Sequence, residues 1–156
     1  YNQLSLFVHK GNPKHVKPEA EDFLRHRLAV LIRNADSGRV ARKARNILQK
    51  AGIYDEVFSK AAMLLPDSRS LNLFLKNDTG DVSLNWRATA FFEDNAPHIE
   101  VVDLDASVST PQALQLNLLT FSQHPEIARR FMHYVASEEG QAVFRKYGFL
   151  DNKTSL

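Results

Sequence analysis

The sequence predicts an α/β protein in which a mainly parallel sheet is flanked by helices. Short apolar stretches with the alternation or continuity of strands recur along the chain. Between them lie segments whose apolar residues have helical spacing, and Gly, Pro, Asp or Ser residues stand at the boundaries. Strands that alternate with helices are joined by crossover connections, which favour parallel pairing.

The expected strands are of two kinds. Residues 1–9 and 82–86 alternate in polarity, which is typical of a strand with one buried face. Residues 27–32 form an almost continuous apolar run, which suits a strand covered on both faces. Residues 113–121 also alternate and are expected to be a strand or an extended crossing segment. Two shorter strands are expected at residues 62–65 and 98–104.

Helices are expected where apolar residues recur every three or four positions. The clearest helix follows the polar turn at residues 34–39, carries Val40, Ala44 and Ile47 on one face and ends at Gly52. Two helices close the chain, one opened by Pro125 and one, with Val143, Phe144 and Tyr147 expected inside, stopped by Gly148. Shorter helices are expected at residues 18–25, at residues 54–61 and from Asp67 onward.

Composition narrows the possible functions. The 156 residues suffice for one compact domain, and a formal net charge of +2 does not indicate a nucleic-acid or membrane surface. The absence of cysteine excludes disulfides, zinc–thiolate sites and cysteine nucleophiles. No apolar run reaches membrane-spanning length, and no signal segment precedes the first strand pattern, so we expect a mature or excised piece of a longer protein.

Three strand ends carry the candidate binding residues. Two strands lead into loops with a hydroxyl, backbone amides and an arginine at a helix N-terminus, and such a terminus attracts anions. The third strand ends in an indole and a guanidinium, both hydrogen-bond donors. If the strands are neighbours, their ends meet at one edge of the sheet. The candidate ligand-binding residues are Ser37, Gly38, Arg39, Ser68, Arg69, Trp86 and Arg87.

Simpler readings of the same residues remain open at this stage. Asp and Ser are favoured N-caps, Trp86 could be a core residue, and Arg87 could be solvated. The basic helix that begins near Arg39 could be read as part of a helix-turn-helix, although a solvated helix face fits the balanced charge of the chain better. No metal spacing joins the six histidines, and no catalytic motif is present, so we expect neither a cofactor nor a catalytic residue.

The C-terminal region resembles the signature of a known family. Residues 121–132, FSQHPEIARRFM, and residues 137–149, SEEGQAVFRKYGF, are similar to the final helices of class II periplasmic solute-binding proteins, in particular the molybdate- and tungstate-binding branch that serves ABC importers. Residues 6–13 resemble the hinge strand into the second lobe, residues 34–52 a ligand-side loop and helix, and residues 80–87 a segment that returns to the anion.

This resemblance implies a two-lobed, non-enzymatic periplasmic protein that closes on an oxyanion such as molybdate or tungstate and delivers it to an ABC importer permease. Carried over by position, it implies ligand contacts near Ser37–Arg39, near Ser68 and Arg69, and at Trp86. The molybdate branch usually has a tyrosine at the position of Trp86. This departure, together with Arg87 beside it, favours a ligand with fuller charge or a carboxylate.

The resemblance also divides the chain. Residues 1–109 correspond to a second α/β lobe, and residues 110–156 to a returning segment and helices that dock on a first lobe upstream of this sequence. Without that lobe, an apolar face is left uncovered, and we expect a homodimer through these helices or their rearrangement. Two other readings remain: the effector domain of a LysR-like regulator or sensor, which shares this architecture, and a small α/β enzyme that handles phosphate or carboxylate groups.

Overall fold

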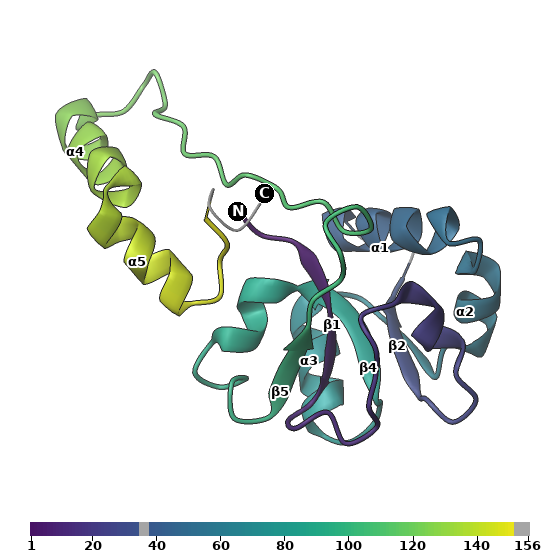
Figure 1. The fold of residues 1–156 in the computed structure, drawn as a ribbon. Coiled ribbons are helices and arrows are strands. Elements are labelled where there is room, and N and C mark those ends of the chain that lie inside the picture. The colour runs from purple at the N-terminus through teal and green to yellow at the C-terminus, as the bar shows by residue number, and fades with distance from the viewer. Residues whose placement is uncertain (35–37, 152–156) are drawn as a thin grey trace.

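The computed structural model describes residues 1–34 and 38–151 and contains a five-stranded sheet in the order β3-β2-β4-β1-β5 (Figure 1). Strand β2 pairs in parallel with β3 and β4, whereas β1 pairs antiparallel with β4 and β5. Four strands therefore run in one direction and β1 runs against them. The predicted α/β class is confirmed. The strands are β1 Leu4–His9, β2 Val30–Arg33, β3 Met63–Leu65, β4 Val82–Trp86 and β5 Ile99–Val102.

Helices cover both faces of this sheet. On one face, η1, α1 and α2 bury side chains of β1, β2 and β4 in a common core. On the other face, α3 and η2 pack over β1, β2, β3 and β5. The helices of the sheet domain are η1 Ala20–Leu24 and η2 Arg87–Phe91, both 3₁₀, and α1 Gly38–Lys50, α2 Tyr54–Lys60 and α3 Ser68–Lys76.

Strand β4 differs from its prediction. The alternating pattern predicted one solvated face, but Ser83 and Asn85 are as fully buried as the apolar residues between them. The reason is that α3 covers the polar face of the strand, while α1 covers the other. Hydrogen bonds from the Asn85 side-chain amide offset the cost of burying this polar group.

The segment after β5 crosses the molecule without joining the sheet. Among the described residues its β-bridge to the start of the chain joins Asn2 and Gln112, and Ser109 Oγ donates a 2.6 Å hydrogen bond to the Leu4 carbonyl. Beyond Gln112 the chain is extended but unpaired, so the alternative of a crossing segment is the correct one. Leu114, Leu116 and Leu119 along it are exposed, because no second layer covers them.

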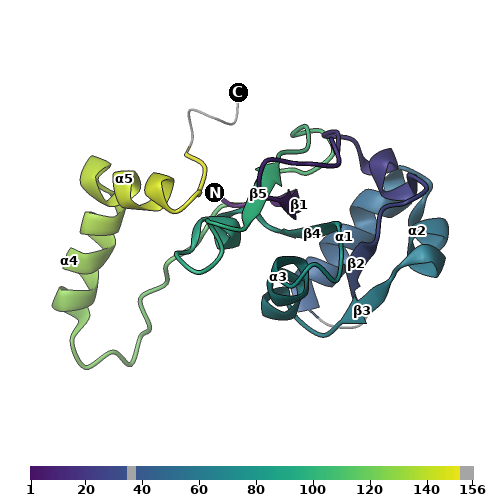
Figure 2. The same cartoon turned by 90° about the horizontal axis from the view of Figure 1, so that it is seen from below.

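The chain ends in a helical hairpin, α4 Pro125–Ala136 and α5 Glu138–Lys146, that stands apart from the sheet (Figures 1 and 2). No residue of α4 is buried. Val143 and Tyr147, expected inside, are 47% and 41% exposed, because the described residues do not bury these side chains in a core. Backbone hydrogen bonds between Tyr1 and Leu150 attach the hairpin to the start of the chain. Among the described helices, none combines the length and apolarity needed to cross a bilayer.

Candidate functional site

Three neighbouring strands end at one edge of the sheet. Because β3, β2 and β4 are adjacent and parallel, their carboxyl ends lie side by side. Helix α1 starts after β2 and α3 starts after β3, so both helix N-termini face this edge. The convergence expected from the sequence is therefore present. In open α/β sheets, ligands bind outside the carboxyl ends of the strands.

The N-terminus of α3 is capped by its own loop. The Asp67 carboxylate accepts a hydrogen bond of 2.7 Å from the backbone N–H of Ser70. Hydrogen bonds from Ser70 are the main reason why the pKa of Asp67 is lowered, and the charge of Arg33 adds a smaller effect. The simpler N-cap reading is correct for Asp67. Ser68 beside it is half-buried and Arg69 is exposed.

The first two residues of α1 are exposed. Gly38 and Arg39 are exposed, and Gly38 has a φ of +83°, in the left-handed region that glycine adopts without strain. A Cβ atom on Gly38 would lie 3.5 Å from Nη2 of Arg33. Ser37, the third candidate residue of this loop, lies outside the described residues.

Arg33, the last residue of β2, is a site residue that sequence analysis missed. Its Nη2 donates a 3.0 Å hydrogen bond to the carbonyl of Pro66, so the guanidinium lies between the loops that open α1 and α3. Its Nε is buried and has no hydrogen-bond partner. The available signal was position, since Arg33 directly follows the apolar run that predicted the strand.

Trp86 lies on the opposite side of β4 from Asn85. Its half-buried ring packs at the margin of the core beneath α1, and the Nζ of Lys43 lies 5.6 Å from the ring centroid. Burial lowers the pKa of the Lys43 ammonium. A cation over an indole is a favourable arrangement, and it adds positive charge near the strand edge.

Arg87 has partners within the protein. Its Nε lies 3.0 Å from both carboxylate oxygens of Asp103, and its Nη1 donates to the carbonyl of Gly148. The guanidinium also covers the ring of Phe91, at 4.8 Å from its centroid. Arg87 therefore links the end of β4 to the segment after β5 and to the C-terminal residues.

A buried amide connects Trp86 with the first turn of α3. Asn85 Nδ2 donates to the Ser68 carbonyl at 3.0 Å and to Asn72 Oδ1 at 2.8 Å. Asn85 Oδ1 accepts from the backbone N–H of Trp86 at 2.9 Å. These three hydrogen bonds fix the end of β4 against α3, which positions the backbone at the edge.

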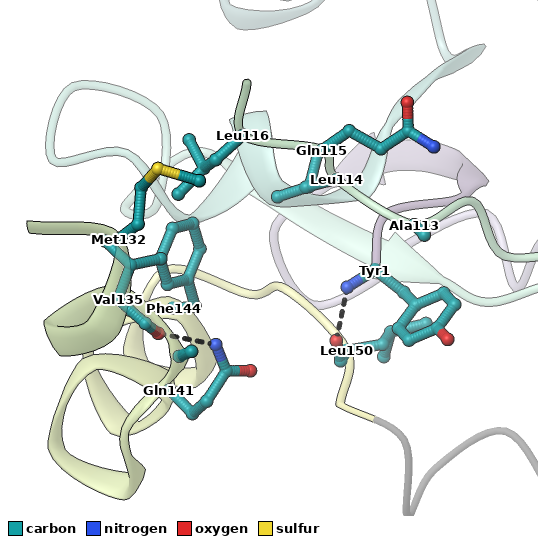
Figure 3. Close-up of a pocket in the computed structure, with 11 residues that line it drawn as sticks. Tyr1, Ala113, Leu114, Gln115, Leu116, Met132, Val135, Gln141, Phe144 and Leu150 are labelled. Atoms are coloured by element: carbon teal, nitrogen blue, oxygen red, sulfur yellow. Dashed lines mark hydrogen bonds between the residues drawn. The ribbon is translucent and has the colours of Figure 1, made fainter. Parts of the chain in front are cut away.

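A concave region lies away from this edge, between the crossing segment and the α4–α5 hairpin (Figure 3). It has a volume of about 770 Å³ and is lined mainly by apolar side chains, including Leu114, Leu116, Met132 and Phe144. Near it, the Gln141 Nε2 donates a 2.8 Å hydrogen bond to the Val135 carbonyl. Such a lining suits an apolar contact better than an anion. Within the described ranges, no cluster of His, Asp or Glu side chains could hold a metal ion.

Comparisons with known proteins agree with this geometry. Residues 1–150 match the family model of bacterial extracellular solute-binding proteins. No curated protein sequence matches the chain. The fold is similar to that of a protein described as the substrate-binding domain of a molybdenum ABC transporter from Clostridium difficile, with a TM-score of 0.72, 18% identity and coverage of 94% of this chain and 62% of the other.

Two further structures have the same fold. The periplasmic molybdate-binding protein of Azotobacter vinelandii has a TM-score of 0.72 and 12% identity, with 97% of this chain and 66% of the other covered. L-phospholactate-bound PEB3, a protein of Campylobacter jejuni, has a TM-score of 0.70 and 15% identity with the same coverage. This chain thus spans less than two thirds of the length of each of the three structures.

Proposed function

Because the chain belongs to the family of bacterial extracellular solute-binding proteins, we propose that it binds a small anion at the shared carboxyl edge of β2, β3 and β4. The observation that carries this proposal is the convergence of the N-termini of α1 and α3 at that edge, beside Trp86. Helix N-termini attract anions, and the exposed Arg39 and Arg69 add positive charge.

The proposed ligand is an oxyanion such as molybdate or tungstate, or a related organic anion. Molybdate and phospholactate, which the two similar proteins are described as binding, are both small anions, and this supports the ligand class. The proposed contacts are Gly38, Arg39, Ser68, Arg69 and Trp86, with Ser37 and Arg87 as further candidates from the sequence. The role that follows is non-enzymatic capture in the periplasm for delivery to the permease of an ABC importer.

We further propose that residues 1–109 form one lobe of a larger binding protein and that the crossing segment and the α4–α5 hairpin pack on another lobe. The exposed leucines of the crossing segment and the absence of buried residues in α4 support this. So does the length of the similar proteins, which exceeds the span of this chain.

Thermal melting with a panel of anions tests the binding function. Molybdate, tungstate, sulfate, phosphate and succinate are added in turn, and one of them is expected to raise Tm. At about 100 times Kd a ligand of the folded state stabilises by about 2.7 kcal/mol. For a chain of this size that corresponds to a Tm increase of about 5–10 °C.

The matched variants for this panel are Trp86→Ala at the edge and Phe92→Ala, an exposed aromatic residue beyond η2. The increase in Tm should disappear in Trp86→Ala and persist in Phe92→Ala. If no anion shifts the Tm of the unmodified chain, or if both variants keep the full shift, the proposed site is wrong.

For this 156-residue chain by itself, we propose that a second copy covers the apolar face of the α4–α5 hairpin. Ile127, Phe131 and Tyr134 lie three to four residues apart on α4 and are all exposed. Sedimentation velocity should show a concentration-dependent dimer in the micromolar range. Phe131→Glu should shift the distribution to monomer, and Arg130→Glu, which alters charge on the same helix, should not. A monomer at all concentrations would contradict the proposal.

A further inference from the structure

We propose that Arg33 is the principal charged contact for the ligand and that it selects an anion with two coplanar oxygens, a carboxylate or a phosphoryl group. This inference rests on the proposed function and refines it. One side chain at the edge of the sheet then determines which class of anion binds, and the sequence motifs did not indicate this residue.

The first argument is the hydrogen bonding of the Arg33 guanidinium. Its one hydrogen bond within the described residues goes to the neutral carbonyl of Pro66, and Nε is buried without a partner. None of the ion pairs in the described part of the chain involves Arg33. A buried cationic donor that lacks an acceptor is destabilising, so its retention calls for an external acceptor.

Asp67, the described acidic residue whose pKa Arg33 affects, does not supply this acceptor. Asp67 is close enough for Arg33 to lower its pKa, but the larger cause of that shift is the hydrogen bonding from Ser70. Its carboxylate is held at the start of α3 by the backbone N–H of Ser70 and makes no ion pair with Arg33. Asp67 therefore offsets the charge of Arg33 at a distance and leaves Nε without an acceptor.

The second argument is the position of Arg33 on the sheet. The parallel register pairs Val30 with Val82 and Leu31 with Ser83, so Arg33 at the end of β2 and Asn85 near the end of β4 both lie toward the same edge of the sheet. At Gly38 the absence of a side chain lets the start of α1 lie close to the guanidinium, since a Cβ there would be 3.5 Å from Nη2.

The ligand class follows from the geometry of the donors. Nε and one Nη of a guanidinium form a planar pair that matches two oxygens of a carboxylate or phosphoryl group. Arg87 already uses its Nε on Asp103, and the side chains of Arg39 and Arg69 are exposed to solvent. Among the described arginines near this edge, Arg33 is the one with a buried Nε that has no hydrogen-bond partner.

Titration calorimetry with inorganic phosphate, succinate and molybdate tests this inference on the full chain. We expect phosphate or succinate to bind. Arg33→Gln should weaken that binding about 10- to 100-fold, the loss of a charge-assisted hydrogen bond or two. Arg33→Lys, which keeps the charge and loses the planar donor pair, should weaken it about tenfold. The control is Arg42→Gln, which removes an exposed arginine of α1 and should leave the affinity unchanged.

A spectroscopic measurement keeps the test independent of variant stability. In the ¹⁵N spectrum of the arginine Nε–H groups, one signal, absent from Arg33→Lys, should shift as phosphate or succinate is added. If the unmodified chain binds an anion but Arg33→Gln binds it equally well and no Nε signal moves, the assignment of Arg33 is wrong and the proposed function stands. If the chain binds none of the anions, both fail. Preferential binding of molybdate that is insensitive to Arg33→Gln also overturns the assignment.

Discussion

Asn85→Leu is expected to lower the free energy of unfolding by about 4 kcal/mol, because a buried group that loses its partner destabilises by about 1–3 kcal/mol. The substitution keeps the size of the side chain but removes all three hydrogen bonds of the Asn85 amide. The Ser68 carbonyl, the Asn72 amide oxygen and the Trp86 N–H then lose this partner. Urea denaturation followed by circular dichroism measures the loss.

The matched control is Asn46→Leu, on the exposed side of α1. It should change the unfolding free energy by less than about 0.5 kcal/mol, as is usual for surface positions. Because Asn85 fixes the end of β4 to α3 and bonds the backbone N–H of Trp86, Asn85→Leu should also remove the increase in Tm that an anion produces, even at temperatures where the variant is folded. A loss of stability below about 1 kcal/mol would show that the amide contributes little beyond its hydrogen bonds to water.

Asp103→Ala is expected to destabilise the protein by about 2–3 kcal/mol, less than the 3–5 kcal/mol typical of a fully buried ion pair, because Asp103 is partly solvated. The side chain of Arg87 is 18% exposed and that of Asp103 is 42% exposed. The carboxylate also accepts hydrogen bonds from Ser5 Oγ at 2.7 Å and Gln3 Nε2 at 3.3 Å. Removal of the Asp103 carboxylate leaves the Arg87 guanidinium with its hydrogen bond to the Gly148 carbonyl.

A double-mutant cycle separates the ion pair from the other contacts. Arg87→Met in the Asp103→Ala background should have a much smaller effect than Arg87→Met alone, with a coupling of at least about 1 kcal/mol. Asp94→Ala, at an exposed carboxylate, serves as the control and should be near neutral. Additive effects of Arg87→Met and Asp103→Ala would mean that the pair does not stabilise the fold.

Much of the fold could be predicted because local signals and tertiary structure agree. Gly52 and Gly148 end their helices as expected, with φ values of +72° and +78°. The alternating polarity of β4 led to the wrong prediction of a solvated face, because Ser83 and Asn85 are polar but buried. A buried polar network and a solvated face look the same in a sequence. Only the hydrogen-bond partners of Asn85, thirteen or more residues away, distinguish them.

The candidate site was predictable in its location but less so in its members. The three strand ends converge because β3, β2 and β4 are neighbours in the sheet, which the sequence left open. Sequence reasoning selected Arg87, because it stands beside Trp86, and did not consider Arg33. The acid that pairs with Arg87 is sixteen residues away, and the loops around Arg33 meet only in the folded chain. Such pairings arise from tertiary contacts that no local pattern records.

The placement of β1 between β4 and β5 has a consequence for biosynthesis. Of the five strands of this sheet β1 is made first, but its neighbours, at Val82–Trp86 and Ile99–Val102, are made much later. Leu4, Leu6, Phe7 and Val8, all buried in the folded protein, therefore remain without partners while most of the chain is translated. Nascent chains that expose apolar, unpaired strands depend on holding factors to avoid aggregation. The sheet therefore cannot be completed until the residues of β5 have been made.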